Sequence, residues 1–477
     1  MADGVVHVEP SALIHRFPPA VGDDGGADVV PVAFLGLLAL SALLAAALLA
    51  GLALGNVPLA AAVFLAALLY DALLGLFVVG CAFRQVCRRR SRPSPGVAAP
   101  PPAIATVIPA WNEGASLLRT VETLLAQEDQ PEEIIVADDG SSDRSLALLQ
   151  ERFAIAFPSR DELGVSACHP HLRVLRKPHS GKADSLNRAI ARTTAEVVMV
   201  LDADTLLCPG AIAAVRRSFA RHPDVDAVGG VLLPTCSDSR WGRWFGFFQR
   251  YEYVIGHLWR LTWSRFDATL LISGACGAFR RGPLLAAGGF DPSSWTEDYE
   301  VMFRLHRHLR RCGRSCRVRI EPDFVARTEA PETIPTFLRQ RRRWIGGAAE
   351  TLFRYRHLVG NRRYGALGML HLAHNTVVLA QPVAVAGLLL MGVLAWGSLP
   401  LGAFFAIVWI PLFAKIGLNQ LIVLGRLWIY RRDVGACGTS YAKGVLEELI
   451  RPLFYRPLQL VSYLWGYWSA VGRNRAW

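Results

Sequence analysis

Lysine is scarce in this 477-residue chain, and the cysteines form no pattern typical of a metal site or a disulfide framework. The 51 basic side chains include four lysines, namely Lys177, Lys182, Lys415 and Lys443. The nine cysteines are odd in number and scattered, and Cys312 and Cys316 have no second pair to complete a zinc site. We therefore expect free thiols in a reducing compartment, and a lysine inside a motif is informative.

Charged side chains are absent from two long stretches of the chain. No Asp, Glu, Lys or Arg lies between Asp28 and Asp71, and none lies between Arg363 and Lys415. Because about 20 apolar residues cross a bilayer as a helix, each stretch is long enough to cross twice. The alternative, a buried helical hairpin in a soluble core, would need unusually long core helices. Turn signals inside each stretch predict four spans, near 29–54, 59–83, 372–397 and 401–425.

The N-terminus lacks the features of a removable signal peptide. Residues 1–28 have no basic n-region and no small-residue cleavage site, so we expect a short exposed tail. An arginine cluster at 84–92 follows the second span, and the positive-inside tendency places it in the cytosol. The central block of the chain would then also be cytosolic.

The basic excess lies mainly in this central block. Residues 84–363 hold 41 Lys+Arg and 30 Asp+Glu, which accounts for nearly all of the formal net charge of +12. A basic surface suits nucleic acid, anionic lipid or a phosphorylated substrate, and charge alone does not choose among them.

The central block alternates between strand and helix patterns. Short β-branched runs at 104–108, 134–137 and 197–201 end in polar or acidic turns, and a stretch with helical periodicity follows each. This alternation predicts an α/β domain with a parallel sheet. Ligands of such sheets bind at the carboxyl ends of the strands, where these turns lie.

Two acidic turns follow the second and third of these strands. Asp138 and Asp139 precede Gly140, and this turn suits either a helix cap or a hydrogen-bond acceptor for a base or ribose. Asp202 and Asp204 directly follow an apolar strand, and their spacing lets both approach one hard divalent cation on a diphosphate. A solvated turn is the alternative for the second pair.

Three further motifs could bind phosphate, bind sugar or supply a general base. Lys182 follows a glycine at a helix start and suits a phosphate contact, or is a solvated surface lysine. Asp298 could be a general base, or could serve the positive end of a helix. Gln340, Arg343 and Trp344 could hold a diphosphate and a sugar ring, or belong to a basic cluster beside the membrane.

Together these motifs resemble those of the membrane-embedded processive glycosyltransferases of family 2, which include the cellulose, chitin, hyaluronan and poly-N-acetylglucosamine synthases. The resemblance covers about residues 103–350 and extends to the flanking spans. The family commonly has Tyr where Trp111 stands. Eight motifs occur in the family's order: Pro109 to Glu113 (PAWNE), Asp138 to Ser141 (DDGS), Gly181 to Ala183 (GKA), Asp202 to Asp204 (DAD), Gln249 to Tyr253 (QRYEY), Ser273 to Arg280 (SGACGAFR), Thr296 to Asp298 (TED) and Gln340 to Trp344 (QRRRW).

The resemblance implies a GT-A type α/β domain with a mainly parallel sheet, flanked by transmembrane and interfacial helices. By resemblance, Asp138 or Asp139 would contact the nucleotide base. Lys182 and Asp202 would bind the nucleotide sugar, and Asp204 would hold Mg²⁺ or Mn²⁺ on the diphosphate.

The same resemblance implies the reaction. Asp298 would be the catalytic base, Arg343 would contact the donor diphosphate, and Gln340 and Trp344 would bind the acceptor sugar. The expected function is polymerisation of UDP-N-acetylglucosamine or UDP-glucose, with inversion, into a β-linked polysaccharide that passes through the membrane. The alternative is the transfer of one sugar to a lipid acceptor.

The expected domain organisation follows from these patterns. It comprises a tail (1–28), a transmembrane helix pair (29–83), a basic and proline-rich linker (84–102), a cytosolic GT-A domain (103–335), an interfacial segment with the QRRRW motif (336–366), a second transmembrane pair (367–430) and an interfacial or transmembrane C-terminal segment (431–477).

The expected partners are the donor, the growing polysaccharide, membrane lipid and accessory or export proteins. We expect a multi-pass protein of the cell membrane with a cytosolic catalytic domain. Arg, Trp and Phe recur at 240–266, which would also suit a nucleic-acid-binding protein. We favour an interfacial helix there and expect no nucleic acid, because phosphate chemistry explains the ordered carboxylates.

Overall fold

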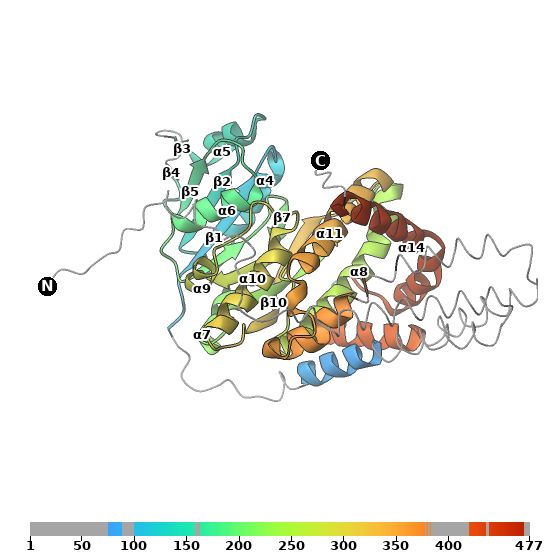
Figure 1. Ribbon diagram of the computed structural model, residues 1–477. Coiled ribbons are helices and arrows are strands. Elements are labelled where there is room, and N and C mark those ends of the chain that lie inside the picture. Colours follow the sequence, from blue (N-terminus) through green and yellow to red (C-terminus); the bar gives the residue numbers. More distant parts are fainter. Residues whose placement is uncertain are drawn as a thin grey trace, which may run out of the picture. The chain divides into compact units, whose positions relative to one another are not determined.

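The computed structural model describes part of the chain (Figure 1). The predicted tail at 1–28 and the span near 29–54 lie outside the described residues, as do most of the other three predicted spans and most of the linker. Among the described helices, none is both long and apolar enough to cross a bilayer. The described residues are 75–87, 100–157, 163–376, 378–379, 382, 419–435 and 438–471.

The described elements alternate between strands and helices in the first half. The strands are β1 (Ile104–Ala110), β2 (Glu133–Asp138), β3 (Ile155–Ala156), β4 (Leu163–Ser166), β5 (Leu172–Arg176), β6 (Val197–Val200), β7 (Thr205–Leu207), β8 (Ala227–Thr235), β9 (Gly277–Arg280) and β10 (Val318–Glu329). The named α-helices are α4 (Ala115–Leu125), α5 (Ser145–Phe153), α6 (Lys182–Ala191), α7 (Ala211–Arg221), α8 (Arg240–Ser264), α9 (Arg281–Ala286), α10 (Glu297–Arg311), α11 (Ile334–Arg354) and α14 (Tyr441–Val471). Further helical segments are 75–87, Arg356–Leu358, Arg362–Tyr364, Leu367–His371 and 419–434.

The strands form one sheet in the order β3-β4-β5-β2-β1-β6-β9-β8-β10-β7. The predicted strands at 104–108, 134–137 and 197–201 are confirmed as β1, β2 and β6, and β5, β2, β1 and β6 run parallel to one another. The flanks differ from the expectation of a mainly parallel sheet, because β4 and β9 run antiparallel to β5 and β6. A short loop joins β4 to β5, which an antiparallel pair permits and a parallel pair does not. The sheet is therefore mixed, with a parallel centre.

Burial explains why the central strands are mainly apolar. All seven residues of β1 and all four of β6 are buried, as expected for strands covered on both faces. Helix α6 packs against β1 and β2, while α4 contacts α5 and β7 (Figure 1). Because β1, β2 and β6 are parallel, the polar motifs that follow them emerge at the same edge of the sheet.

The chain divides into two compact units. One contains Gly96–Leu232 and Leu270–Thr328, and with them the centre of the sheet. The other contains Leu233–Thr269 and Glu329–Trp477, and with them α8, α11 and α14. The eight described cysteines are free thiols, as expected.

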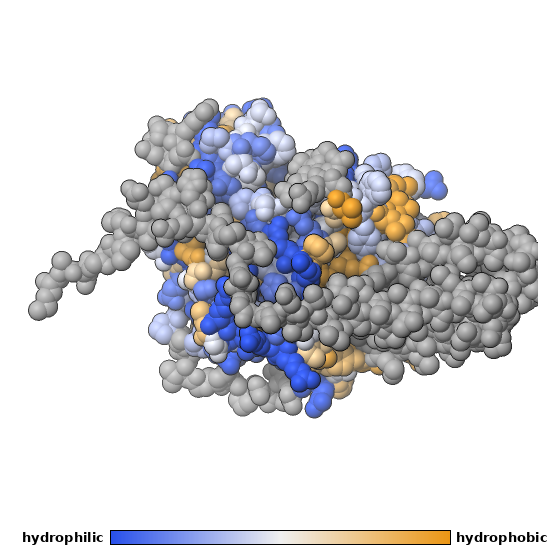
Figure 2. Space-filling model, viewed as in Figure 1, coloured by the Kyte–Doolittle hydropathy of each residue, from blue (hydrophilic) through white to orange (hydrophobic). Residues whose placement is uncertain are grey.

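Helix α14 forms most of the C-terminal segment, for which the sequence allowed either an interfacial or a transmembrane position. It is a single helix of 31 residues that continues through Pro452 and Pro457. Its buried face is polar and repeats at about one helical turn, whereas large apolar side chains such as Leu453 (66% exposed) and Trp468 (78% exposed) point outward. Figure 2 shows apolar side chains exposed over α14. The polar residues of its buried face are Glu447, Arg451, Tyr455, Gln459, Ser462 and Ser469.

Helices α14 and α11 pack closely at a glycine. A Cβ on Gly466 would lie 3.0 Å from the carbonyl oxygen of Arg342 and 3.1 Å from the amide nitrogen of Gly346. This contact requires a residue without a side chain, because any larger residue would push the two backbones apart. It therefore fixes the helix that carries the QRRRW motif against α14.

Candidate active site

The PAWNE and DDGS motifs form one connected edge at the ends of β1 and β2. Asn112 adopts a left-handed conformation (φ 56°), which asparagine tolerates better than most residues. Its Oδ1 accepts hydrogen bonds from the amides of Ser142 (2.8 Å) and Asp143 (3.2 Å). In return, the amide of Asn112 donates to the Ser141 hydroxyl (3.0 Å). The first motif therefore holds the turn of the second.

Asp139 anchors the loop that leads to Lys182. Its carboxylate accepts hydrogen bonds from the amides of Ser180 and Gly181, both at 2.8 Å, and from the Lys177 ammonium. Burial is the largest influence and raises the pKa of Asp139, but the hydrogen bonds outweigh it, so the pKa lies below its ordinary value. The loop thus occupies this carboxylate, and a contact with the nucleotide base stays a prediction.

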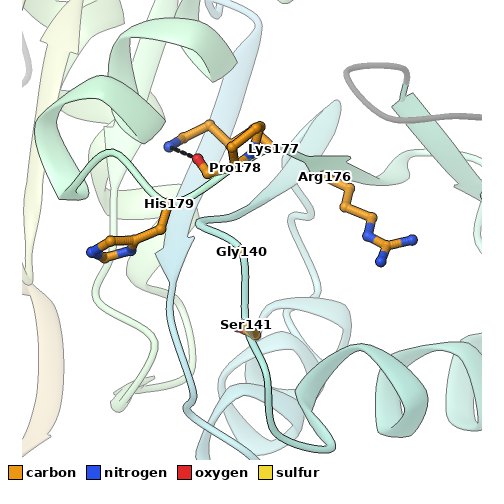
Figure 3. Close-up of a pocket in the computed structure, with 6 residues that line it drawn as sticks. All are labelled: Gly140, Ser141, Arg176, Lys177, Pro178 and His179. Carbon is orange, nitrogen blue, oxygen red and sulfur yellow. Dashed lines mark hydrogen bonds between the residues drawn. The ribbon is translucent and has the colours of Figure 1, made fainter.

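Asp138 lies beside a small cavity. The side chain is buried and accepts a hydrogen bond from the Ser141 amide (3.3 Å). Burial raises the pKa of Asp138 above its ordinary value. Figure 3 shows that the cavity residues come from the loop after β2, the end of β5 and the segment that follows β5. The cavity has a volume of about 260 Å³ and is lined by Gly140, Ser141, Arg176, Lys177, Pro178 and His179.

An aromatic pair extends this region. The ring of Trp111, which is 52% exposed, lies 4.7 Å from the imidazole of His179 between centroids. The cavity is smaller than the roughly 300–1,000 Å³ typical of a site for a whole drug-sized ligand. Its size therefore suits one flat ring of a larger ligand.

Lys182 joins two of the acidic motifs. It is the first residue of α6, and its Nζ lies 2.6 Å from Asp202 Oδ1 and 2.9 Å from Glu297 Oε1. Burial is the largest influence and lowers the pKa of Lys182, but Asp202, Glu297 and Asp298 together raise it above its ordinary value. Lys182 is therefore a charged ammonium at neutral pH that pairs with two carboxylates, and its contact with a phosphate stays a prediction.

Asp298 lies in the same group, in the first turn of α10. Its Oδ2 accepts a hydrogen bond from the Gly274 amide (3.0 Å), and its Oδ1 accepts one from the Tyr299 amide (2.9 Å). Thr296, the N-cap residue, makes no side-chain capping hydrogen bond. The helix N-terminus and these two donors stabilise the ionised carboxylate, which is the form that a general base requires.

Gly274 is confined by this group. A Cβ at this position would lie 3.1 Å from Lys182 Nζ and 3.3 Å from Asp298 Cβ. The glycine of the SGACGAFR motif thus lets the backbone donate to Asp298 while Lys182 lies alongside.

Asp204 is held by hydroxyl groups from two strands. Its Oδ1 accepts hydrogen bonds from Thr205 Oγ1 and Thr328 Oγ1, both at 3.2 Å. Such partners orient a carboxylate that binds a metal ion. Within the described residues no three His, Cys, Asp or Glu side chains form a ready-made metal site. The oxygen ligands of the DAD motif fit a hard cation that shares its coordination with a phosphate.

The QRRRW motif lies on α11 in the second unit. Gln340 and Trp344 are one helical turn apart, and both contact the buried guanidinium of Arg341. Arg343 is half-buried on the same helix, and its contact with the donor diphosphate stays a prediction.

Four residues of the site region were given no role from the sequence. Gly274 and Arg341 lie inside quoted motifs, and Glu297 is the neighbour of Asp298. Their place in the sequence therefore indicated that they lie near the site, but not what they do. Thr328 lies 124 residues after Asp204 in a strand without a motif. No local signal in the sequence could have found it.

Comparison with known proteins decides the family. The family model described as Glycosyltransferase like family 2 matches residues 100–347, just over half of the chain. This chain belongs to glycosyltransferase family 2. The match spans all eight motifs, so the resemblance inferred from the motif order is confirmed.

Curated family 2 relatives share about half of the chain. The poly-beta-1,6-N-acetyl-D-glucosamine synthase of Staphylococcus epidermidis is 29% identical over 253 residues, which are 53% of this chain and 56% of that protein. The protein of the same name from Staphylococcus aureus (strain COL) is 28% identical over 253 residues, with the same shares. The chain therefore spans about half the length of the curated relatives it matches.

A solved structure has the same fold. The mannosyltransferase PcManGT from Pyrobaculum calidifontis, in complex with GDP-Man and Mn²⁺, aligns with a TM-score of 0.52 at 20% identity. The alignment covers 82% of this chain and 99% of that one. At this identity the likeness concerns the fold alone, and it confirms the GT-A type α/β fold expected for family 2.

Proposed function

We propose that this family 2 chain is a metal-dependent, inverting glycosyltransferase that polymerises a UDP-sugar into a β-linked polysaccharide. The observation that carries the proposal is the group formed by Lys182, Asp202, Glu297 and Asp298, where three sequence motifs meet. It combines a charged ammonium with a carboxylate, Asp298, that two backbone amides hold in place. A phosphate contact and a proton acceptor are what transfer from a nucleotide sugar needs.

The donor would bind along the edge of the sheet. The base would enter the cavity beside Asp138 and Gly140, and Lys182 would contact the diphosphate. A diphosphate oxygen could take the place of one of the two carboxylates that now pair with Lys182. Arg343 is proposed as a second cationic contact for the diphosphate.

Asp204 would hold a Mg²⁺ or Mn²⁺ ion, with Asp202 as a neighbouring oxygen ligand. The support is the oxygen donor set and the hydroxyl groups of Thr205 and Thr328 that fix the Asp204 carboxylate. When bound, the ion supplies positive charge that stabilises a leaving diphosphate. Lys182 remains the protein's own cation at this end of the site.

The reaction would be a single displacement. An acceptor hydroxyl oxygen forms a bond to the anomeric carbon while the bond from that carbon to the diphosphate oxygen breaks. The leaving nucleoside diphosphate takes the electron pair, and Asp298 takes the hydroxyl proton. Attack from the face opposite the leaving group converts an α-linked donor into a β-linked product. Gln340 and Trp344 are proposed to hold the acceptor sugar, with the indole as a flat platform.

The proposed donor is UDP-N-acetylglucosamine and the proposed product a β-1,6-linked polymer, on the strength of the Staphylococcus relatives. UDP-glucose is the second donor to test. We also propose a multi-pass membrane location with a cytosolic catalytic unit, in contact with lipid and with accessory or export proteins. The support is the two uncharged stretches and the arginine cluster at 84–92.

A donor screen with the detergent-solubilised full chain tests this function. Each UDP- or GDP-sugar is supplied with Mg²⁺, Mn²⁺ or a chelator, and release of the nucleoside diphosphate is measured. The product is then treated with a hydrolase specific for β-1,6-linked N-acetylglucosamine. We expect release with UDP-N-acetylglucosamine, loss of release with the chelator, and a digestible product. Equal release with the chelator would contradict the metal, and a product that resists the hydrolase would contradict the linkage.

A further inference from the structure

The QRRRW motif contains one arginine that is buried rather than exposed. Arg341 is 2% exposed and ranks among the largest fully buried side chains of the described residues. Its Nη2 lies 2.6 Å from Glu252 Oε2, a residue of the QRYEY motif on α8. The Tyr455 hydroxyl on α14 donates to the same carboxylate oxygen, and Gln459 Nε2 donates to the other at 3.3 Å. Three helices therefore hold this guanidinium in one place.

The same guanidinium also contacts both proposed acceptor residues. Arg341 Nη1 donates to Gln340 Oε1 at 2.9 Å, and the Arg341 Cζ lies 4.1 Å from the centroid of the Trp344 ring. A cation over an indole face stabilises one orientation of the ring, and a hydrogen bond to an amide oxygen fixes which way the amide points. One buried group thus determines the orientation of both side chains.

We propose that Arg341 is a positioning residue that acts through Gln340 and Trp344, and that Glu252 and Tyr455 hold it for this purpose. The inference rests on the proposed role of Gln340 and Trp344 in binding the acceptor sugar. Planarity is essential to it. A guanidinium can pair with Glu252, donate to Gln340 and stack on Trp344 at once, whereas a lysine ammonium can satisfy the ion pair alone.

The neighbouring arginine provides a matched control. Arg342 donates from Nε to Ser469 Oγ at 2.8 Å and lies over the ring of Trp465 at 4.8 Å. Like Arg341, Arg342 makes a hydrogen bond and a contact with an aromatic ring, but its partners lie on α14 and have no proposed role in binding sugar. A variant at Arg342 therefore reports the cost of loosening the helix pair alone.

The test measures the KM for a soluble acceptor oligosaccharide and the KM for the donor in Arg341→Lys, Arg342→Lys and the wild type. We expect Arg341→Lys to raise the acceptor KM about tenfold and to leave the donor KM within about twofold, because misplaced binding groups lose affinity for their own ligand. Arg342→Lys should leave both constants within about twofold. Equal effects of the two variants on the acceptor KM would overturn the proposal.

A double-mutant cycle separates positioning from general stability. In a Gln340→Ala/Trp344→Ala background, Arg341→Lys should change the acceptor KM by less than about twofold, since the groups it acts through are gone. If Arg341→Lys raised the acceptor KM by the same factor in this background as in the wild type, the proposal would be overturned. If Arg341→Lys does not fold, Tyr455→Phe keeps the ring and removes the hydroxyl that holds Glu252, and the same comparison applies. If the double alanine background itself keeps the wild-type acceptor KM, the proposed acceptor site fails and this inference fails with it, whereas donor turnover would still stand.

Discussion

Replacing Lys182 with methionine removes the cation from the group of carboxylates and keeps the length of the side chain. In the wild type this ammonium pairs with Asp202 at 2.6 Å and with Glu297 at 2.9 Å. The Lys182 side chain is 32% exposed. Each of its ion pairs should therefore contribute up to about 1 kcal/mol, as a surface pair does, and not the roughly 3–5 kcal/mol lost when a buried pair is broken. We expect Lys182→Met to lower the free energy of unfolding by about 2 kcal/mol near neutral pH.

The stability difference between the wild type and Lys182→Met should depend on pH, and the pKa of Lys182 gives the direction of that dependence. The folded-state pKa of Lys182 is raised, so its stabilising contribution is complete below the ordinary lysine pKa and is lost only as the pH rises through the folded value. Between about pH 5 and pH 8 the wild-type contribution is therefore constant. In the variant, Asp202, Glu297 and Asp298 face one another without a cation, which favours their protonated forms. The deficit of the variant should accordingly shrink as the pH falls.

The assay is denaturant unfolding of the detergent-solubilised protein at about pH 5 and about pH 8, with UDP binding measured in parallel. Lys443→Met is the matched control, because Lys443 is exposed on α14 and the substitution is the same. We expect the control to match the wild type, and Lys182→Met to lose UDP affinity as well as stability at the higher pH. A deficit of the same size at both pH values, or none at either, would refute the reasoning.

Three further substitutions test single contacts. Asp298→Asn should lower the transfer rate by about 10²–10⁴-fold, the usual contribution of a general base, while UDP binding stays within about twofold; full activity would remove Asp298 from this role. Gly274→Ala should lower the transfer rate about tenfold, because its Cβ would crowd two site residues, whereas Gly282→Ala, whose Cβ meets open space, should be neutral in the same rate assay. Gly140 has a positive φ (74°), and a Cβ at this position would lie 2.8 Å from a backbone nitrogen, whereas Gly210 has a similar φ (79°) and open space around its Cβ position. Gly140→Ala should therefore unfold at a lower denaturant concentration and bind UDP less well than Gly210→Ala. Equal behaviour of the two variants would show that the contact does not matter.

The sequence was sufficient to predict the central strands. The runs at 134–137 and 197–201 are entirely apolar and the run at 104–108 is apolar except for Thr106, because both faces of those strands are buried, and this pattern is local. The antiparallel flanks were not predicted. Strands β4 and β9 are four residues long, and a pattern of that length does not fix direction.

The partners of the predicted site residues were less accessible from the sequence. The pairing of Lys182 with Glu297 spans 115 positions, and that of Asp204 with Thr328 spans 124, so tertiary structure alone brings them together. Asp138 or Asp139 was expected to contact the nucleotide base, and the structure adds that the Asp139 oxygens accept hydrogen bonds from Ser180 and Gly181 in the loop before α6. Local sequence indicates that a carboxylate is needed at a strand end, but it does not indicate which group that carboxylate binds.

The reversed polarity of α14 also required the structure. Glu447, Arg451 and Gln459 would suit a solvated face when judged by composition. They are buried instead, because Glu447 pairs with Arg451 and Gln459 donates to Glu252 on α8. Charged residues at helical spacing show which side chains share a face, and the partners across the interface decide whether that face is buried.

The length of the product at low turnover tests the central claim most directly. Purified full-length protein is given labelled UDP-sugar, a divalent cation and acceptor in large excess, and the products are separated by size after a small fraction of the donor has been used. A processive polymerase predicts long chains beside unused acceptor, with few products of intermediate length. A single added sugar on nearly every modified acceptor, or on a lipid, would contradict the account.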